Sequence, residues 1–462
     1  MTNPHSQILT VAQMRAAEQA LIDAGTGVDA LMQRAGRGAA EWVYRLAWPK
    51  PVTVLCGPGN NGGDGYVIAE ALRAKGLPVT VVEAMQPATA AAQNARALYA
   101  GGTAMAGELP YGAVLVDCLF GSGLTRPLAP ETLDLLRRLA NSHHHRVAID
   151  LPSGVESDSG RPLNEGLPDY VLTLALGAWK FAHWTMPASS AMGARHLVPI
   201  GVGEMPEAAL LLGRPKLAAP AADAYKYTRG LLAVVAGAMP GAALLASEAA
   251  MRGGTGYVKL AAHTVPAGAP PELVVQPDAL TDTRLSALLI GPGLGRGDWA
   301  REKLAEAIRL PVPRVIDADG LLLMKPDMLA SRSAPLVVTP HEGELARLAD
   351  AFDVHASGKA GIARKLARRV GMVVVAKGPD TFVAAPDGRL AVACPASSWL
   401  STAGTGDVLA GIVASRLATG ADGFDAACEG VWLHGEAGRL AGPALTPSSL
   451  IAQIPVALAA CL

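Results

Sequence analysis

A glycine-rich turn near the C-terminus carries residues that could perform chemistry. It runs from Ser401 to Asp407 (STAGTGD) and leads directly into an apolar segment with the character of a helix. The first turn of a helix has unpaired backbone N–H groups at its positive dipole end, and glycine lets a ligand approach them closely. Such amides can hold a phosphoryl group. Asp407, at the start of the helix, is placed to take a proton from a hydroxyl group. The turn therefore predicts a phosphoryl-transfer site.

Other glycine- or proline-containing turns in the C-terminal half follow short apolar runs that we predict to be strands. Ligands of parallel α/β sheets bind at the carboxyl ends of the strands, so we expect these turns to line one site. The pattern GxxxxGK[ST] is absent, which excludes a P-loop. The turns begin at Ala236, Ile290, Asp317, Thr339 and Ala376.

A second glycine turn, Gly57–Gly65, follows the predicted strand Val52–Cys56. It matches GxGxxG, and Glu83 ends the next predicted strand where a dinucleotide-binding fold has its acidic residue. The turn also contains two asparagines and Asp64, which is more polar than a dehydrogenase requires. We interpret it as a phosphate-binding turn.

Carboxylates end two further predicted strands of this half, at Asp117 and Asp150. A flexible loop, 120–127, follows the first, and Ser153 follows the second. We expect these groups to meet the Gly57–Gly65 turn in one crevice. Oxygen ligands of this kind suit a hard cation and not zinc. The alternative for each aspartate is that it caps a turn or a helix.

The composition excludes several classes of protein. Lys+Arg is 39 and Asp+Glu is 40 in 462 residues, which gives no electrostatic reason to bind nucleic acid or an anionic membrane. The five cysteines include no CxxC pair, and no apolar stretch is long enough to span a membrane. We predict a cytoplasmic protein with reduced thiols. The run His143–His145 is expected to be a solvated loop.

Alternating strands and helices predict a doubly wound α/β architecture. The segment 213–223, rich in proline and alanine, interrupts the alternation and is the predicted linker. We expect two domains, 1–215 and 216–462. The first is a Rossmann-like sandwich and the second an α/β/α layer structure.

The first domain resembles the NAD(P)H-hydrate epimerase domain. The resemblance is carried by Gly57–Gly65, Val116–Leu124, Ala148–Gly154 and Leu31–Gly36. It implies interconversion of the R and S forms of a hydrated nicotinamide ring, with a potassium ion held by Asn61, Asp117 and Ser153. Asp150 is our candidate for handling the proton, because burial raises the pKa of a carboxyl group. The implied substrate-binding residues are Asn60, Asn61, Gly62, Gly63, Asp64, Gly121, Ser122, Gly123, Leu124, Thr125, Arg126, Pro127 and Asp150.

The second domain resembles the ribokinase-like superfamily, and within it the ADP-dependent NAD(P)H-hydrate dehydratases. ADP would phosphorylate the ring hydroxyl, giving AMP, and loss of phosphate would restore the reduced dinucleotide. Asp407 would be the base and magnesium would bridge nucleotide oxygens. The implied hydrate-binding residues are Ala242, Gly293, His341 and Asp407. The implied nucleotide-binding residues are Lys377, Gly378, Pro379, Asp380, Thr381 and Gly406.

Together the two resemblances imply a bifunctional NAD(P)H-hydrate repair enzyme that acts on NADHX and NADPHX. One alternative is a vitamin or sugar kinase with a non-catalytic nucleotide-binding N-terminal domain. Others are an NAD-dependent dehydrogenase and an N-terminal regulatory module. Some of these residues also have structural alternatives. In these, His341 is a turn residue, Lys377 is a solvated charge, and Asp317 and Asp319 cap a helix. The sequence does not determine whether the protein is a homo-oligomer, which hydrate it prefers, or whether ADP or ATP is the donor.

Overall fold

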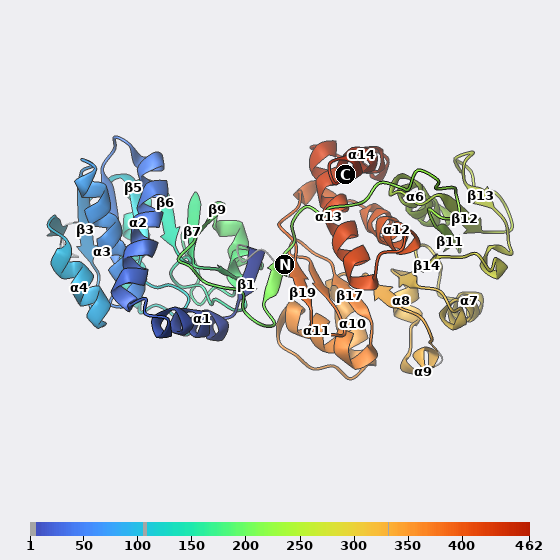
Figure 1. Ribbon diagram of the computed structural model, residues 1–462, viewed down its shortest axis with the longest axis horizontal. Helices are drawn as coiled ribbons and strands as arrows, with labels where there is room; N and C mark the ends of the chain where they lie inside the picture. The colour runs from blue at the N-terminus through green and yellow to red at the C-terminus, as the bar shows by residue number, and fades with distance from the viewer. Residues whose placement is uncertain (1–5, 105–108, 331) are drawn as a thin grey trace. The chain divides into compact units, whose positions relative to one another are not determined.

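Figure 1 shows the computed structural model of the chain, which describes residues 6–104, 109–330 and 332–462. The chain divides into two compact units, Met1–Leu210 and Leu211–Leu462. Residues 212–230, which include the predicted linker, contain no helix or strand. No helix of the described residues is long and apolar enough to cross a membrane.

The first unit is built on a parallel sheet with the strand order β4-β3-β2-β5-β6-β7-β9. Cys56, the last residue of β2, is paired with Glu83 on one side and Cys118 on the other, so three strands end at one level. Their apolar residues are buried because helices cover both faces. The strands are β2 (Val52–Cys56), β3 (Val79–Glu83), β4 (Gly102–Ala104), β5 (Gly112–Cys118), β6 (His143–Ile149), β7 (Leu172–Leu176) and β9 (Ala194–Val198).

Successive residues of each strand point to opposite faces of this sheet. Val54 belongs to the core that contains α2 and α3, whereas Leu55 belongs to the core that contains α5. Outside the sheet, the short strand β1 (Gln7–Leu9) pairs with β8 (Trp179–Lys180). The helices are α1 (Val11–Asp23), α2 (Val28–Ala47), α3 (Asn60–Ala74), α4 (Ala90–Leu98) and α5 (Pro130–Asn141), with 3₁₀ turns at Phe181–His183 and Ala188–Ala191.

The expectation of a solvated loop at residues 143–145 is wrong, because β6 begins at His143. The His143 ring is buried and both of its nitrogens have partners. Nδ1 lies 2.7 Å from the Leu139 carbonyl oxygen and Nε2 lies 2.8 Å from Thr53 Oγ1. A fully hydrogen-bonded neutral imidazole can be buried at little cost. Burial accordingly lowers its pKa.

The second unit contains strands in the order β13-β12-β11-β14-β15-β16-β17, all parallel, followed by β18 and β19, which are antiparallel. The strands are β11 (Leu231–Val235), β12 (Tyr257–Ala261), β13 (Val274–Val275), β14 (Ala287–Ile290), β15 (Arg314–Ile316), β16 (Leu336–Val338), β17 (Val373–Ala376), β18 (Phe382–Ala384) and β19 (Leu390–Val392). β10 (Ala209–Leu211) lies at the boundary of the two units.

Helices α6 and α12 pack closely against each other in this unit (Figure 1). A Cβ added to Gly411 of α12 would lie 2.2 Å from the Ala246 carbonyl oxygen of α6. Further along, Thr255 Oγ1 donates to Ser415 Oγ at 2.8 Å. Both helices therefore begin at the same end of the sheet. The helices are α6 (Pro240–Arg252), α7 (Asp298–Arg309), α8 (Asp319–Leu323), α9 (Pro326–Leu329), α10 (Glu342–Ala351), α11 (Gly358–Val370), α12 (Thr405–Ala418), α13 (Gly423–Ala441) and α14 (Pro447–Ala459).

Both units thus have helices packed on predominantly parallel sheets, which confirms the predicted α/β fold class. The predicted strand Val52–Cys56 has the observed bounds.

Candidate functional site

The Gly57–Gly65 turn brings the loops after β2 and β5 into contact. A Cβ at Gly62 would lie 1.9 Å from the Gly57 carbonyl oxygen, and a Cβ at Gly57 would lie 1.9 Å from that of Leu119. Only glycine fits at these two positions. Gly59 is the N-cap of α3 and makes no side-chain capping bond, which leaves the first amides of α3 to other acceptors.

Replacing Gly62 with alanine is expected to destabilise the first unit by about 1–3 kcal/mol, the usual effect of overpacking. The new methyl group would collide with backbone, which cannot move aside as a side chain can. Urea unfolding would measure the loss. Gly59→Ala is the matched control, because nothing lies within 4 Å of its added Cβ and its φ of −93° suits alanine. Equal stability of the two variants would contradict the expectation.

Asn61, Gly121 and Asp150 lie together at the carboxyl end of this sheet. A Cβ at Gly121 would lie 2.9 Å from Asp150 Oδ2 and 3.4 Å from Asn61 Oδ1. Asn61 Oδ1 and Nδ2 are both buried and lack a hydrogen-bond partner among the described residues. Buried amides without partners are uncommon and costly, so a ligand is expected to satisfy this one.

Asp117 and Ser153 also meet, but they bond chiefly to each other. Ser153 Oγ donates to Asp117 Oδ1 at 2.7 Å and Tyr170 Oη donates to Oδ2 at 2.6 Å. The backbone N–H groups of Leu119 and Ser153 add two more hydrogen bonds, each of 3.1 Å. Burial raises the pKa of Asp117, although these four donors oppose the shift. The loop after β5 connects the two clusters, since Phe120 N donates to Ser153 Oγ.

Asp150 is held by a buried lysine that the sequence analysis did not include. Lys180 Nζ forms an ion pair with Asp150 Oδ1, and the lysine is 1 % exposed. Ser122 N donates to Asp150 Oδ2 at 2.9 Å, and His183 Nε2 lies 2.7 Å from the Asp150 carbonyl oxygen. Burial favours a raised pKa, but the Lys180 ammonium outweighs it and leaves the pKa of Asp150 below its usual value. The predicted upward shift is therefore wrong.

Two other carboxyl groups near this pair have the opposite shift. Burial, and then the charge of Asp150, raise the pKa of Asp64 well above its usual value. Burial is also the largest reason for the raised pKa of Glu18 on α1, where Lys180 opposes and Asp150 adds to the shift. The Asp64 carboxyl accepts no hydrogen bond within the described part of the chain. The crevice thus combines a carboxylate that stays ionised with a carboxyl group that keeps its proton more readily.

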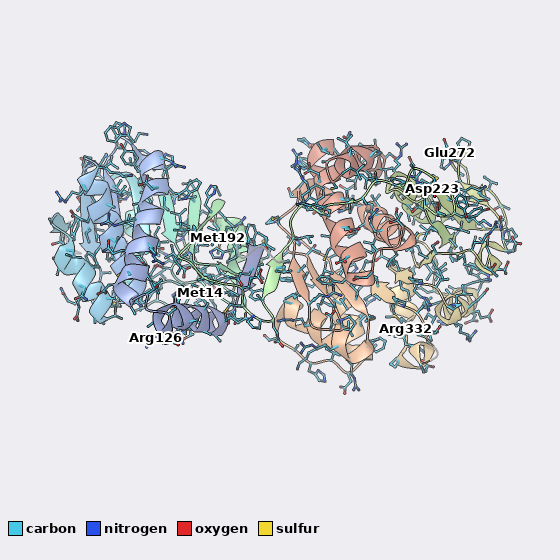
Figure 2. All side chains as sticks on the ribbon, in the orientation of Figure 1. Met14, Arg126, Met192, Asp223, Glu272 and Arg332 are labelled. Carbon is cyan, nitrogen blue, oxygen red and sulfur yellow. The ribbon has the colours of Figure 1, made fainter. Side chains whose placement is uncertain are left out.

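The remaining predicted residues of this half lie around the crevice with different exposure. Asn60 Oδ1 accepts from Thr89 Oγ1 at 2.8 Å, and Gly63 is buried against Met32. Arg126 is exposed and is labelled in Figure 2. Gly123, Thr125 and Pro127 are exposed, and Leu124 is half-buried.

In the second unit, the turn before α12 is formed as the sequence predicts. Gly404 has φ 94°, the left-handed region that favours glycine, and α12 begins at Thr405. Thr405 Oγ1 donates to the carbonyl oxygens of Leu400 and Thr402, both at 2.8 Å. His434 Nε2 lies 3.0 Å from the Thr405 carbonyl oxygen. Burial lowers the pKa of His434 to about 4, so this support is a neutral imidazole at physiological pH.

Asp407 lies beside an ion pair that ends two strands. Lys377 Nζ, after β17, is 2.8 Å from Asp317 Oδ1, after β15. A Cβ at Gly406 would lie 3.5 Å from Lys377 Nζ. Burial first, then the charge of Asp317, raise the pKa of Asp407 to about 6, and Lys377 partly opposes them. Lys377 is therefore not a solvated charge.

Neither Asp317 nor Asp319 is the N-cap of α8, which is Ala318. Asp319 instead accepts from Gly295 N at 3.0 Å and from Arg296 Nε at 2.9 Å. It therefore fixes the loop after β14 and does not cap a helix.

Ala242, in the first turn of α6, and Gly293, in the loop after β14, lie together. Gly293 has φ 62°, and a Cβ there would lie 2.2 Å from the Met239 carbonyl oxygen and 3.1 Å from Ala242 Cβ. His341 is the N-cap of α10, where Nδ1 accepts from Gly343 N at 3.0 Å and Glu344 Oε2 accepts from His341 N at 2.8 Å. Its side chain is 62 % exposed, and its Nε2 lies 3.4 Å from Glu344 Oε1.

The predicted nucleotide-binding loop, 377–381, connects β17 and β18. Thr381 Oγ1 donates to the Gly378 carbonyl oxygen at 3.0 Å, which shapes the turn. Asp380 is buried in an ion pair with Lys359 of α11, whereas Gly378 and Pro379 are exposed. The exposed turn is open to a nucleotide, and the Lys359–Asp380 pair holds its base.

Four residues of these sites were not predicted from the sequence: Lys180, Glu18, Lys359 and His434. Lys180 had a usable signal, because it follows the end of a predicted strand by a few residues, as the predicted ligands do. The other three lie on the helices α1, α11 and α13, outside the predicted loops, and no local pattern marks them.

Two parallel sheets, each with a glycine turn and carboxylates at the carboxyl ends of its strands, define a two-domain α/β enzyme. A sequence model described as NAD(P)H-hydrate dehydratase matches residues 232–455, and one described as YjeF-related protein N-terminus matches residues 28–181. Relatives at least 32 % identical over more than nine tenths of this chain show that it belongs to the family of bifunctional NAD(P)H-hydrate repair enzymes.

Similar proteins extend over nearly the whole chain. The bifunctional NAD(P)H-hydrate repair enzyme of Gloeobacter violaceus is 35 % identical over 94 % of this chain and 93 % of its own. That of Mycobacterium leprae is 32 % identical over 98 % and 99 %. Among solved structures, an ADP/ATP-dependent NAD(P)H-hydrate dehydratase from Bacillus subtilis, co-crystallised with ATP and Mg²⁺, is 28 % identical with a TM-score of 0.47. The match covers 54 % of this chain and 95 % of the Bacillus subtilis chain.

Proposed function

We propose that the chain repairs hydrated NADH and NADPH in two steps. The first unit interconverts the R and S hydrates, and the second removes water from the S form at the expense of ADP, giving AMP and phosphate. The observation that carries the proposal is that each unit has its own carboxylates beside a helix-initiating glycine turn, in a chain of this family.

In the dehydratase step, Asp407 takes the proton of the ring hydroxyl group. At the same time the hydroxyl oxygen bonds to the terminal phosphorus of ADP, and AMP leaves. Amides of the 404–407 turn and Lys377 stabilise the negative charge on the transferring group. The ring nitrogen then donates its electrons as the carbon–oxygen bond breaks and phosphate departs. Loss of a proton from the neighbouring carbon restores the double bond.

Magnesium would reach this site with the nucleotide. No cluster of three His, Cys, Asp or Glu side chains that could hold a metal occurs among residues 6–104, 109–330 and 332–462. Mg²⁺ commonly takes most of its ligands from phosphates and water, so a site with few protein ligands fits it. Bound there, it would neutralise charge on the nucleotide phosphates.

Dehydration of S hydrate is expected to slow as the pH falls below about 6. Asp407 acts as a base only when ionised, and its pKa of about 6 means that the ionised fraction falls about tenfold per pH unit below that value. The measurement is kcat/KM for S hydrate between pH 5 and about 8. A rate that is flat across this range would contradict the role of Asp407.

In the epimerase step, the hydroxyl must leave one face of the ring carbon and water must add to the other. Asp64, whose pKa is raised, gives a proton to the departing hydroxyl, and the ring nitrogen stabilises the cation. Asp150, kept ionised by Lys180, accepts the proton of the incoming water. The Gly57–Gly65 turn and the 121–127 loop hold the rest of the substrate.

The proposed potassium site fits these residues only in part. Asn61 Oδ1 is buried and unpartnered, as an open ligand would be. Asp117 and Ser153 use their oxygens in mutual hydrogen bonds, so the potassium proposal rests chiefly on Asn61. Comparing epimerase rates in potassium, sodium and tetramethylammonium salts tests it, and equal rates would overturn it.

The test of the proposed function is recovery of NADH absorbance from mixed R and S hydrates with magnesium, potassium and ADP, and with ATP in parallel. Full recovery supports both activities, and the faster nucleotide identifies the donor. Recovery limited to the S fraction, beyond spontaneous epimerisation, would remove the epimerase. No recovery with either nucleotide would favour the small-molecule kinase. A cytoplasmic location, which we also propose, agrees with five cysteines that include no CxxC pair.

A further inference from the structure

A cavity of about 600 Å³ opens beside the proposed hydrate site, at the carboxyl ends of β11 and β12. Its wall includes Ala238 and Leu294, from the loops after β11 and β14, and Pro240, which begins α6 and lies two residues before Ala242. The proposed nucleotide loop follows β17, on the other side of β15 and Asp317. The cavity therefore extends the hydrate site away from the nucleotide loop.

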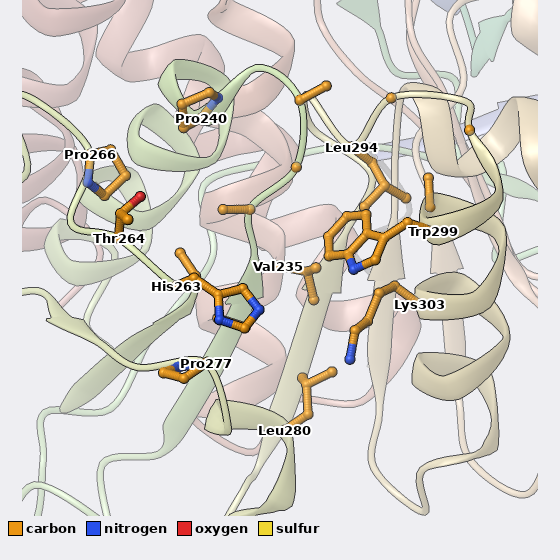
Figure 3. Close-up of a pocket in the computed structure, with 18 of the residues that line it drawn as sticks. Val235, Pro240, His263, Thr264, Pro266, Pro277, Leu280, Leu294, Trp299 and Lys303 are labelled. Atoms are coloured by element: carbon orange, nitrogen blue, oxygen red, sulfur yellow. The ribbon is translucent and has the colours of Figure 1, made fainter.

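Aromatic and basic side chains line this cavity. Figure 3 shows the Trp299 indole and the His263 ring directed into it from opposite sides, with Lys303 beside the indole. Trp299 and Lys303 lie on α7, four residues apart, and so share one face of the helix. Trp299 is 45 % exposed, although large apolar side chains are usually covered. No Asp or Glu side chain is among the described residues that line the cavity.

The basic groups differ in how firmly they are held. Arg296 bonds to Asp319, whose side chain is largely buried. Among the residues that the structure describes, Lys303 pairs only with Glu306, on the surface of the same helix. Exposed pairs of this kind contribute little, so Lys303 can exchange its partner for an anionic ligand. An indole face with a nearby ammonium group suits a purine that carries a phosphate.

The hydrated dinucleotide has such an end. With its hydrated ring at Asp407, the rest of the molecule must extend along the sheet edge. The ends of β11 and β15 are two strand spacings apart, about 10 Å, a gap that a diphosphate with two riboses can cross.

We propose that this cavity binds the adenosine end of the hydrated dinucleotide, with the purine on Trp299 and the 2′-phosphate of NADPH hydrate at Lys303. This assignment rests on the proposed dehydratase function. ADP carries the same purine, so the experiment must separate the two ligands.

The experiment measures KM for S-NADH hydrate, S-NADPH hydrate and ADP in the full chain and its variants. Trp299→Ala is expected to raise KM for both hydrates about tenfold, the usual effect of losing a base–aromatic stack. Lys303→Gln is expected to raise KM for NADPH hydrate severalfold more than for NADH hydrate. KM for ADP and kcat should stay near wild type in both. Arg301→Gln is the matched control, since Arg301 lies on α7, pairs with Asp298 and is outside the cavity.

Unchanged hydrate KM values in Trp299→Ala, or a rise in the KM for ADP instead, would overturn the assignment of the cavity. An equal effect of Lys303→Gln on both hydrates would overturn the assignment of the 2′-phosphate. A wild-type chain without activity on either hydrate would instead overturn the proposed function.

Discussion

Replacing Asp407 with asparagine is expected to slow ADP-dependent dehydration of S hydrate by about 10²- to 10⁴-fold, the range that a positioned general base contributes. Asparagine keeps the size of the side chain and the start of α12 but cannot accept the proton. KM for ADP should change little, because the amides of the 404–407 turn and Lys377 remain. Single-turnover formation of NADH from purified S hydrate measures the rate.

Two controls separate this effect from general damage. The residual rate of Asp407→Asn should lose the inflection near pH 6, because the titrating group is gone. Asp425→Asn, an exposed aspartate in the first turn of α13, should keep the wild-type rate. The R-to-S rate should also be unchanged, since epimerisation is assigned to the first unit. A wild-type dehydration rate in Asp407→Asn would exclude Asp407 as the base.

The shapes of the two glycine turns could be predicted because they depend on local sequence. A glycine turn followed by a helix fixes where the backbone exposes its amides, and 57–65 and 404–407 show this. The carboxyl ends of parallel strands share one edge, so Asp317 and Lys377 meet although sixty residues separate them. The periodicity of apolar residues, the residue types of the turns and the rules of sheet topology were sufficient to predict this part of the structure.

The electrostatics could not be predicted in the same way, because they depend on which charges the fold brings together. Asp150 has a lowered pKa through Lys180, which lies thirty residues further along the chain. Asp64 looks equivalent in the sequence, yet it lacks such a partner and has a raised pKa. His143 was misassigned for a related reason, since Thr53 on another strand makes its burial possible. Which of two carboxyl groups is the acid is therefore a tertiary property.

Replacing Lys180 with methionine is expected to abolish measurable epimerisation and to destabilise the first unit by about 3–5 kcal/mol, the usual effect of breaking a buried ion pair. Asp150 is 6 % exposed, so without Lys180 its charge is buried and uncompensated. Its pKa should rise, and it should no longer accept a proton from water at neutral pH. The rate of NADH formation from R hydrate, with ADP present, reports epimerisation, and urea unfolding followed by fluorescence reports stability.

A double variant, Asp150→Asn with Lys180→Met, distinguishes catalysis from stability. Removing both charges should restore much of the lost stability, because no buried charge remains unpaired. Epimerisation should stay absent, since the proton acceptor is gone, while dehydration of S hydrate continues in the second unit. Lys75→Met is the control for a surface pair with Glu41, which is expected to contribute at most about 1 kcal/mol. A double variant that regains both stability and epimerisation would show that the Asp150–Lys180 pair has only a structural role.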